Sequence, residues 1–312
     1  MNKLLNKLAL VAVGMLVGMP AAWAGPVVID GTDANDHGQT DFTTGTQNEE
    51  GWLYMQKVLE NLAPQVGNGN TTVVSLGTEL NTTAYDAINS AFSLSNIAPT
   101  WNFVNITGAT DIANFLDGNS VGGTSLANTG ILYLPTANNA FGDLDNTELA
   151  AINSRGAAIN NFVGGAGNPN LGGGLFAMAE SSSSVTPYGW LTSLLPSLTV
   201  NDVSGSPPIT LTSEGQAAFP GLSNADLSAG PWHNYFTGNF GGLQVLATAA
   251  DNNGVVRPLI LGGGAGTVIT PPPPTGVPEP ASVVGILAFG AFGVGSQLKR
   301  KQQQKNQTTS VN

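Results

Sequence analysis

Cysteine is absent from the 312 residues of this chain, and histidine occurs only twice, as His37 and His233. Without a thiol, no disulfide can staple the fold and no cysteine can act as a nucleophile. A catalytic zinc site needs about three good ligands, which two histidines alone supply poorly. The composition therefore excludes disulfide-stapled folds and thiol enzymes, and it disfavours zinc enzymes.

Basic residues are scarce in the body of the chain. All 20 acidic residues lie between Asp30 and Glu279, and the only basic residues in that range are Lys57, Arg155 and Arg257, which leaves a formal net charge of −17 there. Nucleic-acid binding depends on clustered lysine and arginine, so we expect no nucleic-acid partner. The body also offers few groups for an acid–base pair, which favours a non-catalytic protein.

The first 24 residues have the pattern of a secretory signal peptide. Lys3 and Lys7 flank the start of an apolar run, and Ala22 and Ala24 form an A-x-A cleavage site for signal peptidase. A positive start, an apolar run and small residues in this order are typical of export signals. We therefore expect an exported chain that begins near Gly25 after processing.

The C-terminal end is divided into three segments. Residues 269–280, ITPPPPTGVPEP, form a Pro-rich linker, which favours an extended spacer. Residues 281–298 are apolar and just long enough for a single transmembrane helix. Residues 299–312 form a basic tail that begins with Lys299, Arg300 and Lys301, and the positive-inside rule places such a tail in the cytoplasm.

The order of Pro278, Glu279 and Pro280, then the apolar segment, then the basic residues resembles the PEP-CTERM sorting signal of bacterial envelope proteins. The resemblance implies that an exosortase-like enzyme recognises the tail and cuts near the PEP element. The protein would then pass from an intermediate tethered to the inner membrane to the cell envelope, the cell surface or the extracellular space. The alternative is an ordinary C-terminal anchor helix.

In residues 25–268, short apolar runs alternate with amphipathic ones, and no repeat of 20 to 50 residues is visible. Strands are predicted at 26–30, 71–77, 101–108, 130–135 and 172–180, helices at 48–64, 84–92, 110–116 and from Asp145 to Gly164, and a late hairpin at 243–263. Repeated strand and helix alternation favours a parallel sheet covered by helices on both faces. We expect one α/β domain: a flavodoxin-like three-layer sandwich with a mostly parallel sheet, a late β-hairpin and long Gly-rich loops.

This domain resembles the class I glutamine amidotransferase-like fold. The resemblance rests on the DGTDANDHG loop (30–38), the strand GGGLFAMAE (172–180) and the segment GPWHNYFTGNFGGLQVLATA (230–249). In that family a cysteine follows the strand that matches GGGLFAMAE. Glu180, Ser181 and Ser182 stand there in this chain, so the resemblance implies the fold without thiol-dependent glutamine hydrolysis.

Three candidate sites follow from these segments. Ser181 or Ser182 with His233 as base would suit a serine hydrolase, although the glycines of a G-x-S-x-G elbow are missing. The loop residues that suit a hard cation such as calcium are Asp30, Asp33, Asn35, Asp36 and His37. The same residue types also favour turns and helix caps. No other cofactor is expected.

Four aromatic residues in Gly- and Pro-rich contexts form the third candidate: Tyr188, Trp190, Trp232 and Tyr235. Exposed rings stack on sugars or partner proteins, whereas buried ones cover the ends of the sheet. The function we expect is a non-catalytic binding or structural component of the envelope or extracellular matrix, with extracellular polysaccharide as a candidate partner. The alternative is an extracellular serine-type hydrolase acting on carbohydrate or ester substrates.

Overall fold

A computed structural model describes residues 25–137, 141–164, 172–178 and 188–263. The predicted signal peptide, the Pro-rich linker, the apolar segment 281–298, the basic tail and both candidate serines, Ser181 and Ser182, lie outside the described residues. Within the described part of the chain, no helix has the length and apolar character needed to cross a membrane.

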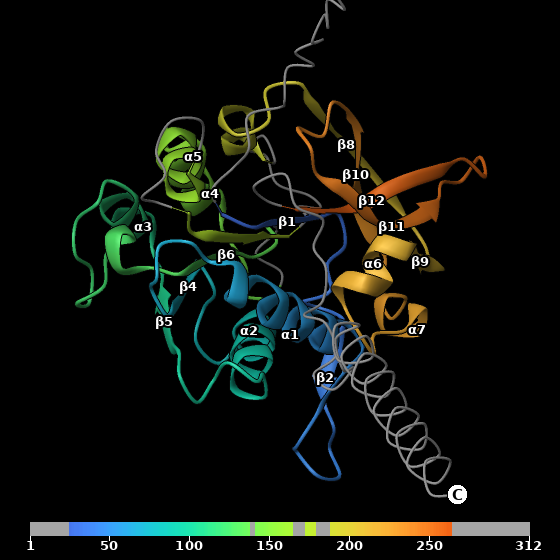
Figure 1. Ribbon diagram of the computed structural model, residues 1–312, viewed down its shortest axis with the longest axis horizontal. Coiled ribbons are helices and arrows are strands. Elements are labelled where there is room, and N and C mark those ends of the chain that lie inside the picture. Colours follow the sequence, from blue (N-terminus) through green and yellow to red (C-terminus); the bar gives the residue numbers. More distant parts are fainter. Residues whose placement is uncertain (1–24, 138–140, 165–171, 179–187, 264–312) are drawn as a thin grey trace, which may run out of the picture. The chain divides into compact units, whose positions relative to one another are not determined.

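The core of the domain is a sheet of eight strands in the order β5-β4-β6-β7-β1-β12-β11-β9 (Figure 1). The first five run parallel: β5 (Asn102–Ile106), β4 (Thr72–Leu76), β6 (Ile131–Leu134), β7 (Gly174–Ala177) and β1 (Val27–Asp30). The last three are antiparallel additions: β12 (Val256–Gly263), β11 (Gln244–Ala250) and β9 (Ile209–Leu211). The mixed α/β class, the mostly parallel sheet and the late hairpin, formed by β11 and β12, are confirmed.

The position of β1 differs from the flavodoxin strand order. In that order the first strand lies between the second and the third. Here β1 lies between β7 and β12, at the far end of the parallel block from β5. The sequence predicted no strand order, because apolar periodicity identifies a strand but not its neighbours. As a consequence, the loop after β1 emerges beside the late strands of the chain.

Helices cover both faces of the sheet, as predicted. One face carries α1 (Glu50–Leu62), α2 (Thr83–Ser93), α6 (Ser213–Ala218) and α7 (Asn224–Leu227), and the other carries α3 (Ala109–Leu116), α4 (Asn146–Asn153) and α5 (Gly156–Val163) (Figure 1). Alternate strand residues serve the two cores, so Val28 and Tyr133 pack on the first face and Ile29 and Leu134 on the second. Short 3-10 turns occupy Ala63–Gln65, Leu126–Asn128 and Gly189–Ser193.

The single helix predicted from Asp145 to Gly164 is two helices in the structure. The capping box of Asp145 and Glu148 opens α4 as expected, and α5 ends at Gly164 with φ 85°. Between them, Gly156 packs so tightly that an added Cβ would lie 2.5 Å from the Trp190 carbonyl oxygen. The break at Arg155, which has φ −120° and ψ 24°, thus lies next to a close long-range contact that the local sequence does not reveal.

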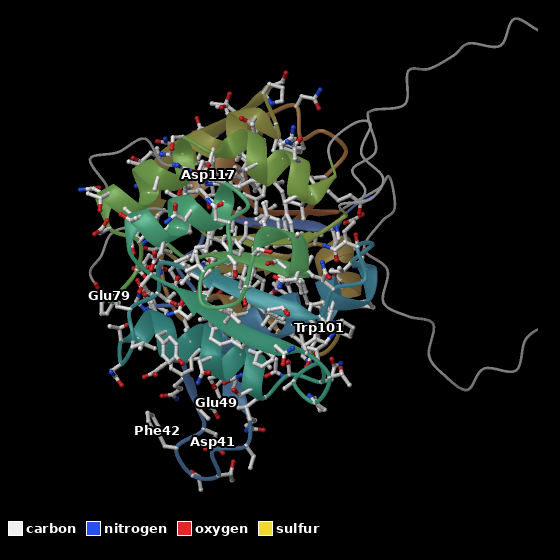
Figure 2. The ribbon with its side chains drawn as sticks, turned by 90° about the vertical axis from the view of Figure 1, so that its left-hand side faces the viewer. Asp41, Phe42, Glu49, Glu79, Trp101 and Asp117 are labelled. Atoms are coloured by element: carbon white, nitrogen blue, oxygen red, sulfur yellow. The ribbon has the colours of Figure 1, made fainter. Side chains whose placement is uncertain are left out.

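Two short ribbons that the sequence did not predict flank the central sheet. β8 (Leu198–Gly205) pairs with β10 (Trp232–Gly238), and β2 (Gly38–Thr40) pairs with β3 (Asn48–Glu49). The β2–β3 turn projects from the body, with Asp41 and Phe42 near its tip (Figure 2). Phe42 is 89% exposed. Strand β8 lacks apolar alternation because none of its residues is buried, which explains why its sequence resembles a loop.

Candidate functional site

The DGTDANDHG loop leaves the carboxyl end of β1, where α/β sheets commonly bind ligands. Asp30 is fully buried, and its carboxylate accepts hydrogen bonds from the Thr32 N–H (2.7 Å) and the Thr32 hydroxyl (2.9 Å). The Tyr188 hydroxyl donates to the Asp30 carbonyl oxygen. Burial raises the pKa of Asp30 to about 7, although the bonds from Thr32 oppose that rise. The first residue of the loop is thus buried and hydrogen-bonded within a local turn.

Asp33 is the centre of the loop, because both histidines of the chain reach it. His233 Nε2 lies 2.9 Å and His37 Nε2 lies 3.3 Å from the same atom, Asp33 Oδ2. Burial alone would raise the pKa of Asp33, but the hydrogen bonds from His233 and His37 outweigh it and hold the pKa below its ordinary value. The bond to Asp33 in turn raises the pKa of His37. Asp33 is therefore an ionised carboxylate that joins β10 to the loop after β1.

Asn35 connects the same loop to the segment after β6. Its side-chain amide donates to Asp36 Oδ1 (3.0 Å), Thr136 Oγ1 (3.0 Å) and Asp143 Oδ1 (2.8 Å). Burial, and then the charges of neighbouring carboxylates, raise the pKa of Asp36 and of Asp143 above the ordinary value. Asp143 was not identified from the sequence, because it lies 108 positions from Asn35. These two carboxyls and the amide lock two loops together.

The predicted calcium ligands all serve these internal contacts. Among the described residues, no group of three or more His, Asp or Glu side chains is arranged to hold a metal ion. Asp30 faces Thr32, Asp33 faces the two histidines, and Asp36 faces Asn35. In the structure, the side chains of this loop form turns and connect the loop to neighbouring segments.

His233, the predicted base, contacts a serine that the sequence analysis did not consider, Ser204. Its Nδ1 atom lies 3.0 Å from Ser204 Oγ, while its Nε2 atom faces Asp33. Ser204 lies on β8 and is exposed. The sequence offered no signal for this pairing, since β8 and β10 are 29 positions apart at this point and β8 resembles a loop.

The candidate aromatic surface is mostly interior. Tyr188, Trp190 and Trp232 are 5%, 3% and 0% exposed and belong to the two apolar cores. Tyr235 is half-buried beneath the guanidinium of Arg257, whose Cζ atom is 4.7 Å from the ring centroid. Of the two alternatives, burial holds for these three residues, and they form no exposed stacking surface.

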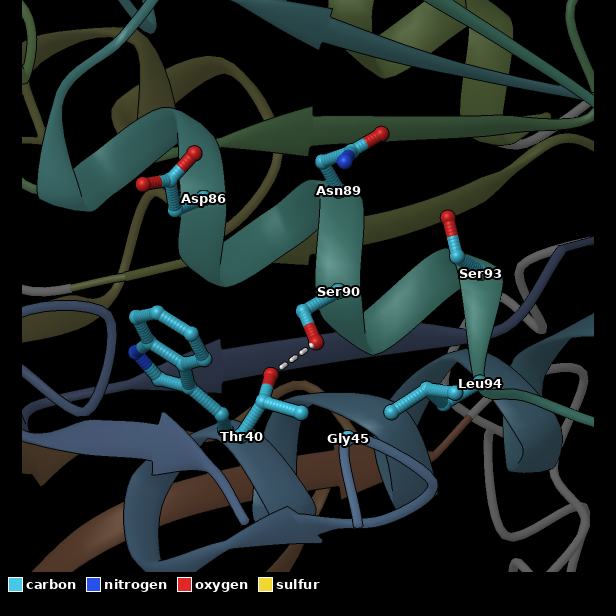
Figure 3. A pocket seen from close by; sticks show the side chains of 8 residues that line it. Thr40, Gly45, Asp86, Asn89, Ser90, Ser93 and Leu94 are labelled. Atoms are coloured by element: carbon cyan, nitrogen blue, oxygen red, sulfur yellow. Dashed lines mark hydrogen bonds between the residues drawn. The ribbon is translucent and has the colours of Figure 1, made fainter. Parts of the chain in front are cut away.

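A second candidate site is a groove of about 400 Å³ between α2 and the β2–β3 ribbon (Figure 3). Its lining residues are Thr40, Gly45, Trp52, Asp86, Asn89, Ser90, Ser93 and Leu94. Four of them, at positions 86, 89, 90 and 93, recur at the three- and four-residue spacing that puts side chains on one face of a helix. The groove is thus a row of polar side chains beside an indole.

Some side chains of this groove are hydrogen-bonded within the protein and others are not. Ser90 is bonded to Thr40 (2.7 Å between the hydroxyl oxygens) and to Asn48. By contrast, the side chains of Asp86, Asn89 and Ser93 have no hydrogen-bond partner among the described residues. Trp52 is fixed because its Nε1–H donates to the Asn35 carbonyl oxygen at 3.0 Å. The groove therefore combines a fixed aromatic ring with free polar groups.

Comparisons with protein-family models, with curated proteins and with solved structures found no match.

The raised pKa of Asp30 predicts how stability depends on pH. The folded protein holds this proton up to about pH 7, whereas an unfolded Asp releases it near 3.8, so the contribution of Asp30 to stability is complete below pH 4 and is lost as pH rises through 7. As pH rises from 5 to 8, the free energy of unfolding of the wild type should fall by about 2 to 3 kcal/mol more than that of Asp30→Asn, which has no carboxyl to titrate at this position.

Urea unfolding followed by tryptophan fluorescence at the two pH values measures this difference. Asp111→Asn changes an exposed carboxylate on α3 and serves as the matched control, with a wild-type pH dependence. Equal pH dependence in Asp30→Asn and the wild type would contradict the buried, protonated state of Asp30.

Proposed function

We propose that this chain is an exported envelope protein, delivered by a PEP-CTERM tail, whose α/β domain binds a neutral extracellular saccharide. The observation that carries the proposed location is the order of signals in the sequence: an export signal at 1–24, then Pro278, Glu279 and Pro280, an apolar segment and a basic end. Signal peptidase and an exosortase-like enzyme are the processing partners in this proposal.

The proposed domain is a variant of the flavodoxin-like, amidotransferase-like sandwich. Support comes from the helices on both faces of a mostly parallel sheet and from the late hairpin. The first strand occupies a different place in the order. A shared fold would not imply a shared activity, and the family thiol has no counterpart in this chain.

Charge supports a neutral ligand. Each basic residue of the body is already in an ion pair with a carboxylate: Lys57 with Glu60 (2.9 Å), Arg155 with Asp117 (2.8 Å) and Arg257 with Asp251 (2.8 Å). No free cation of the described residues remains to neutralise an anionic polymer, and the net negative charge of the body repels one. An uncharged polysaccharide needs no cation to neutralise it, and the negative charge of the body does not repel it.

Groove chemistry supports a saccharide. The apolar face of a sugar ring packs on an aromatic ring, and its hydroxyls need donors and acceptors placed nearby. The groove supplies Trp52 for the first role and Asp86, Asn89 and Ser93 for the second. The β2–β3 turn on one side of the groove projects from the body (Figure 2), which suits contact with one segment of a long chain.

The proposed location predicts the mass of the native protein. Intact mass spectrometry of protein from its own envelope fraction should show a species without residues 1–24 and without the segment after about Pro280. A membrane species that retains 281–312 would mean a plain anchor and would contradict sorting by cleavage of the tail.

The proposed binding role predicts the effect of changing the groove. The double variant Asp86→Ala/Asn89→Ala should weaken binding to soluble neutral glucans at least about tenfold, a loss of about 1.4 kcal/mol, because it removes two hydrogen-bonding groups. Affinity electrophoresis in gels that contain the glucan measures this change. Alginate, an anionic polymer, should not retard the wild type.

Asp111→Ala/Asn114→Ala is the matched control, since it removes the same two residue types from exposed positions of α3 on the opposite face of the sheet. Equal retardation of the two double variants, or no retardation of the wild type by any neutral glucan, would overturn the proposed groove.

A further inference from the structure

Ser204, His233 and Asp33 form a continuous hydrogen-bonded series. Ser204 Oγ lies 3.0 Å from His233 Nδ1, and His233 Nε2 lies 2.9 Å from Asp33 Oδ2. We infer that this series is a hydrolytic centre in which Ser204 is the nucleophile, His233 the general base and Asp33 the positioning carboxylate, acting on uncharged carboxylic esters. The inference goes beyond the proposed saccharide binding and does not depend on it.

The proton positions follow from the chemistry of the three groups. An ionised carboxylate only accepts hydrogen bonds, so Asp33 Oδ2 requires the His233 proton on Nε2. A neutral imidazole with its proton on Nε2 has its lone pair on Nδ1, and Nδ1 faces Ser204. The Ser204 hydroxyl therefore donates to Nδ1, as a nucleophile must donate to its base. His37, at 3.3 Å from the same Asp33 oxygen, adds a second donor to that carboxylate.

Backbone pairing fixes His233 in place. The register of β8 and β10 shifts around His233: Trp232 pairs with Gly205 and Asn234 pairs with Asp202, so two residues of β8, Val203 and Ser204, lie opposite this one position. The N–H groups of His233 (2.9 Å) and Asn234 (3.1 Å) both donate to the Gly31 carbonyl oxygen. Bulges of this kind redirect side chains and are common near active sites.

Solvent exposure increases from Asp33 through His233 to Ser204, as a hydrolytic centre requires. The Asp33 side chain is 6% exposed and the His233 side chain 15%, whereas Ser204 is an exposed residue. Water is thus kept from the carboxylate while the hydroxyl stays accessible to a substrate. A nucleophile on a surface strand suits an ester group that projects from a larger molecule, such as an acyl substituent.

The proposed reaction balances with water as the only co-reactant. Ser204 Oγ forms a bond to the ester carbonyl carbon as its proton moves to His233 Nδ1. The carbon–oxygen bond to the alcohol then breaks, and the alcohol leaves with that proton. Water then attacks the acyl carbon on Ser204 as one of its protons moves to His233 Nδ1. The bond from that carbon to Ser204 Oγ breaks, the carboxylic acid leaves, and the proton on Nδ1 returns to Oγ, which restores the serine hydroxyl.

Acylation of Ser204 is the step that this geometry promotes, so the test measures acylation rather than turnover. The full-length protein is incubated with a fluorophosphonate, a probe that reacts with activated serines, and the labelled peptide is identified by mass spectrometry. We expect one probe per chain, attached at Ser204. His233→Gln should slow labelling at least about 100-fold, since it removes the base.

The matched control is Ser206→Ala, which removes an exposed hydroxyl two positions away and should label like the wild type, whereas Ser204→Ala should not label. Circular dichroism verifies that each variant is folded. Attachment at Ser181, Ser182 or another serine, equal labelling of the Ser204 and Ser206 variants, or no labelling of the folded wild type would each overturn the inference. Glucan binding by Ser204→Ala should equal that of the wild type, so failure of this centre and failure of the groove are distinguishable.

Discussion

The carboxylate of Asp33 joins parts of the chain that are 200 positions apart, because it accepts hydrogen bonds from His37 in its own loop and from His233 on β10. A buried carboxylate without donors would be costly, so this loop and this strand must meet for the domain to fold as observed. The unexpected place of β1 makes the meeting feasible, since it sets the loop after β1 beside the late strands. The direction of the His233 ring, and with it the contact to Ser204, follows from this one bond.

Scarcity of positive charge shapes the rest of the molecule. Three basic residues cannot compensate 20 acidic ones, so buried Asp30 and Asp143 depend on the neutral donors Thr32 and Asn35, and burial raises the pKa of both carboxyls. The same scarcity leaves each basic residue paired with a nearby carboxylate. The acidic surface, the polar groove beside Trp52 and the predicted signals at 1–24 and 278–301 are what the proposed binding of uncharged ligands outside the cell rests on.

The sequence predicted local features well and long-range ones poorly. A short apolar run predicted the strand at 26–30, observed as Val27–Asp30, and the spacing of Asp145 and Glu148 predicted the start of α4, because each feature depends on neighbours within a few residues. The strand order, the helix break at Gly156 and the ribbon of β8 and β10 depend on contacts between distant segments. In the site, the acidic loop and His233 were identifiable from composition, whereas Ser204 and Asp143 were not, since nothing in their local sequence marks them.

The most direct test of this account is the protonation state of the two ring nitrogens of His233, measured by ¹⁵N NMR near pH 8, where a free histidine is neutral. The account predicts a proton on Nε2 and a bare Nδ1, with that preference lost in Asp33→Asn. A proton on Nδ1 in the wild type would contradict it, because Asp33 would then not determine the state of His233 and Ser204 would have no base.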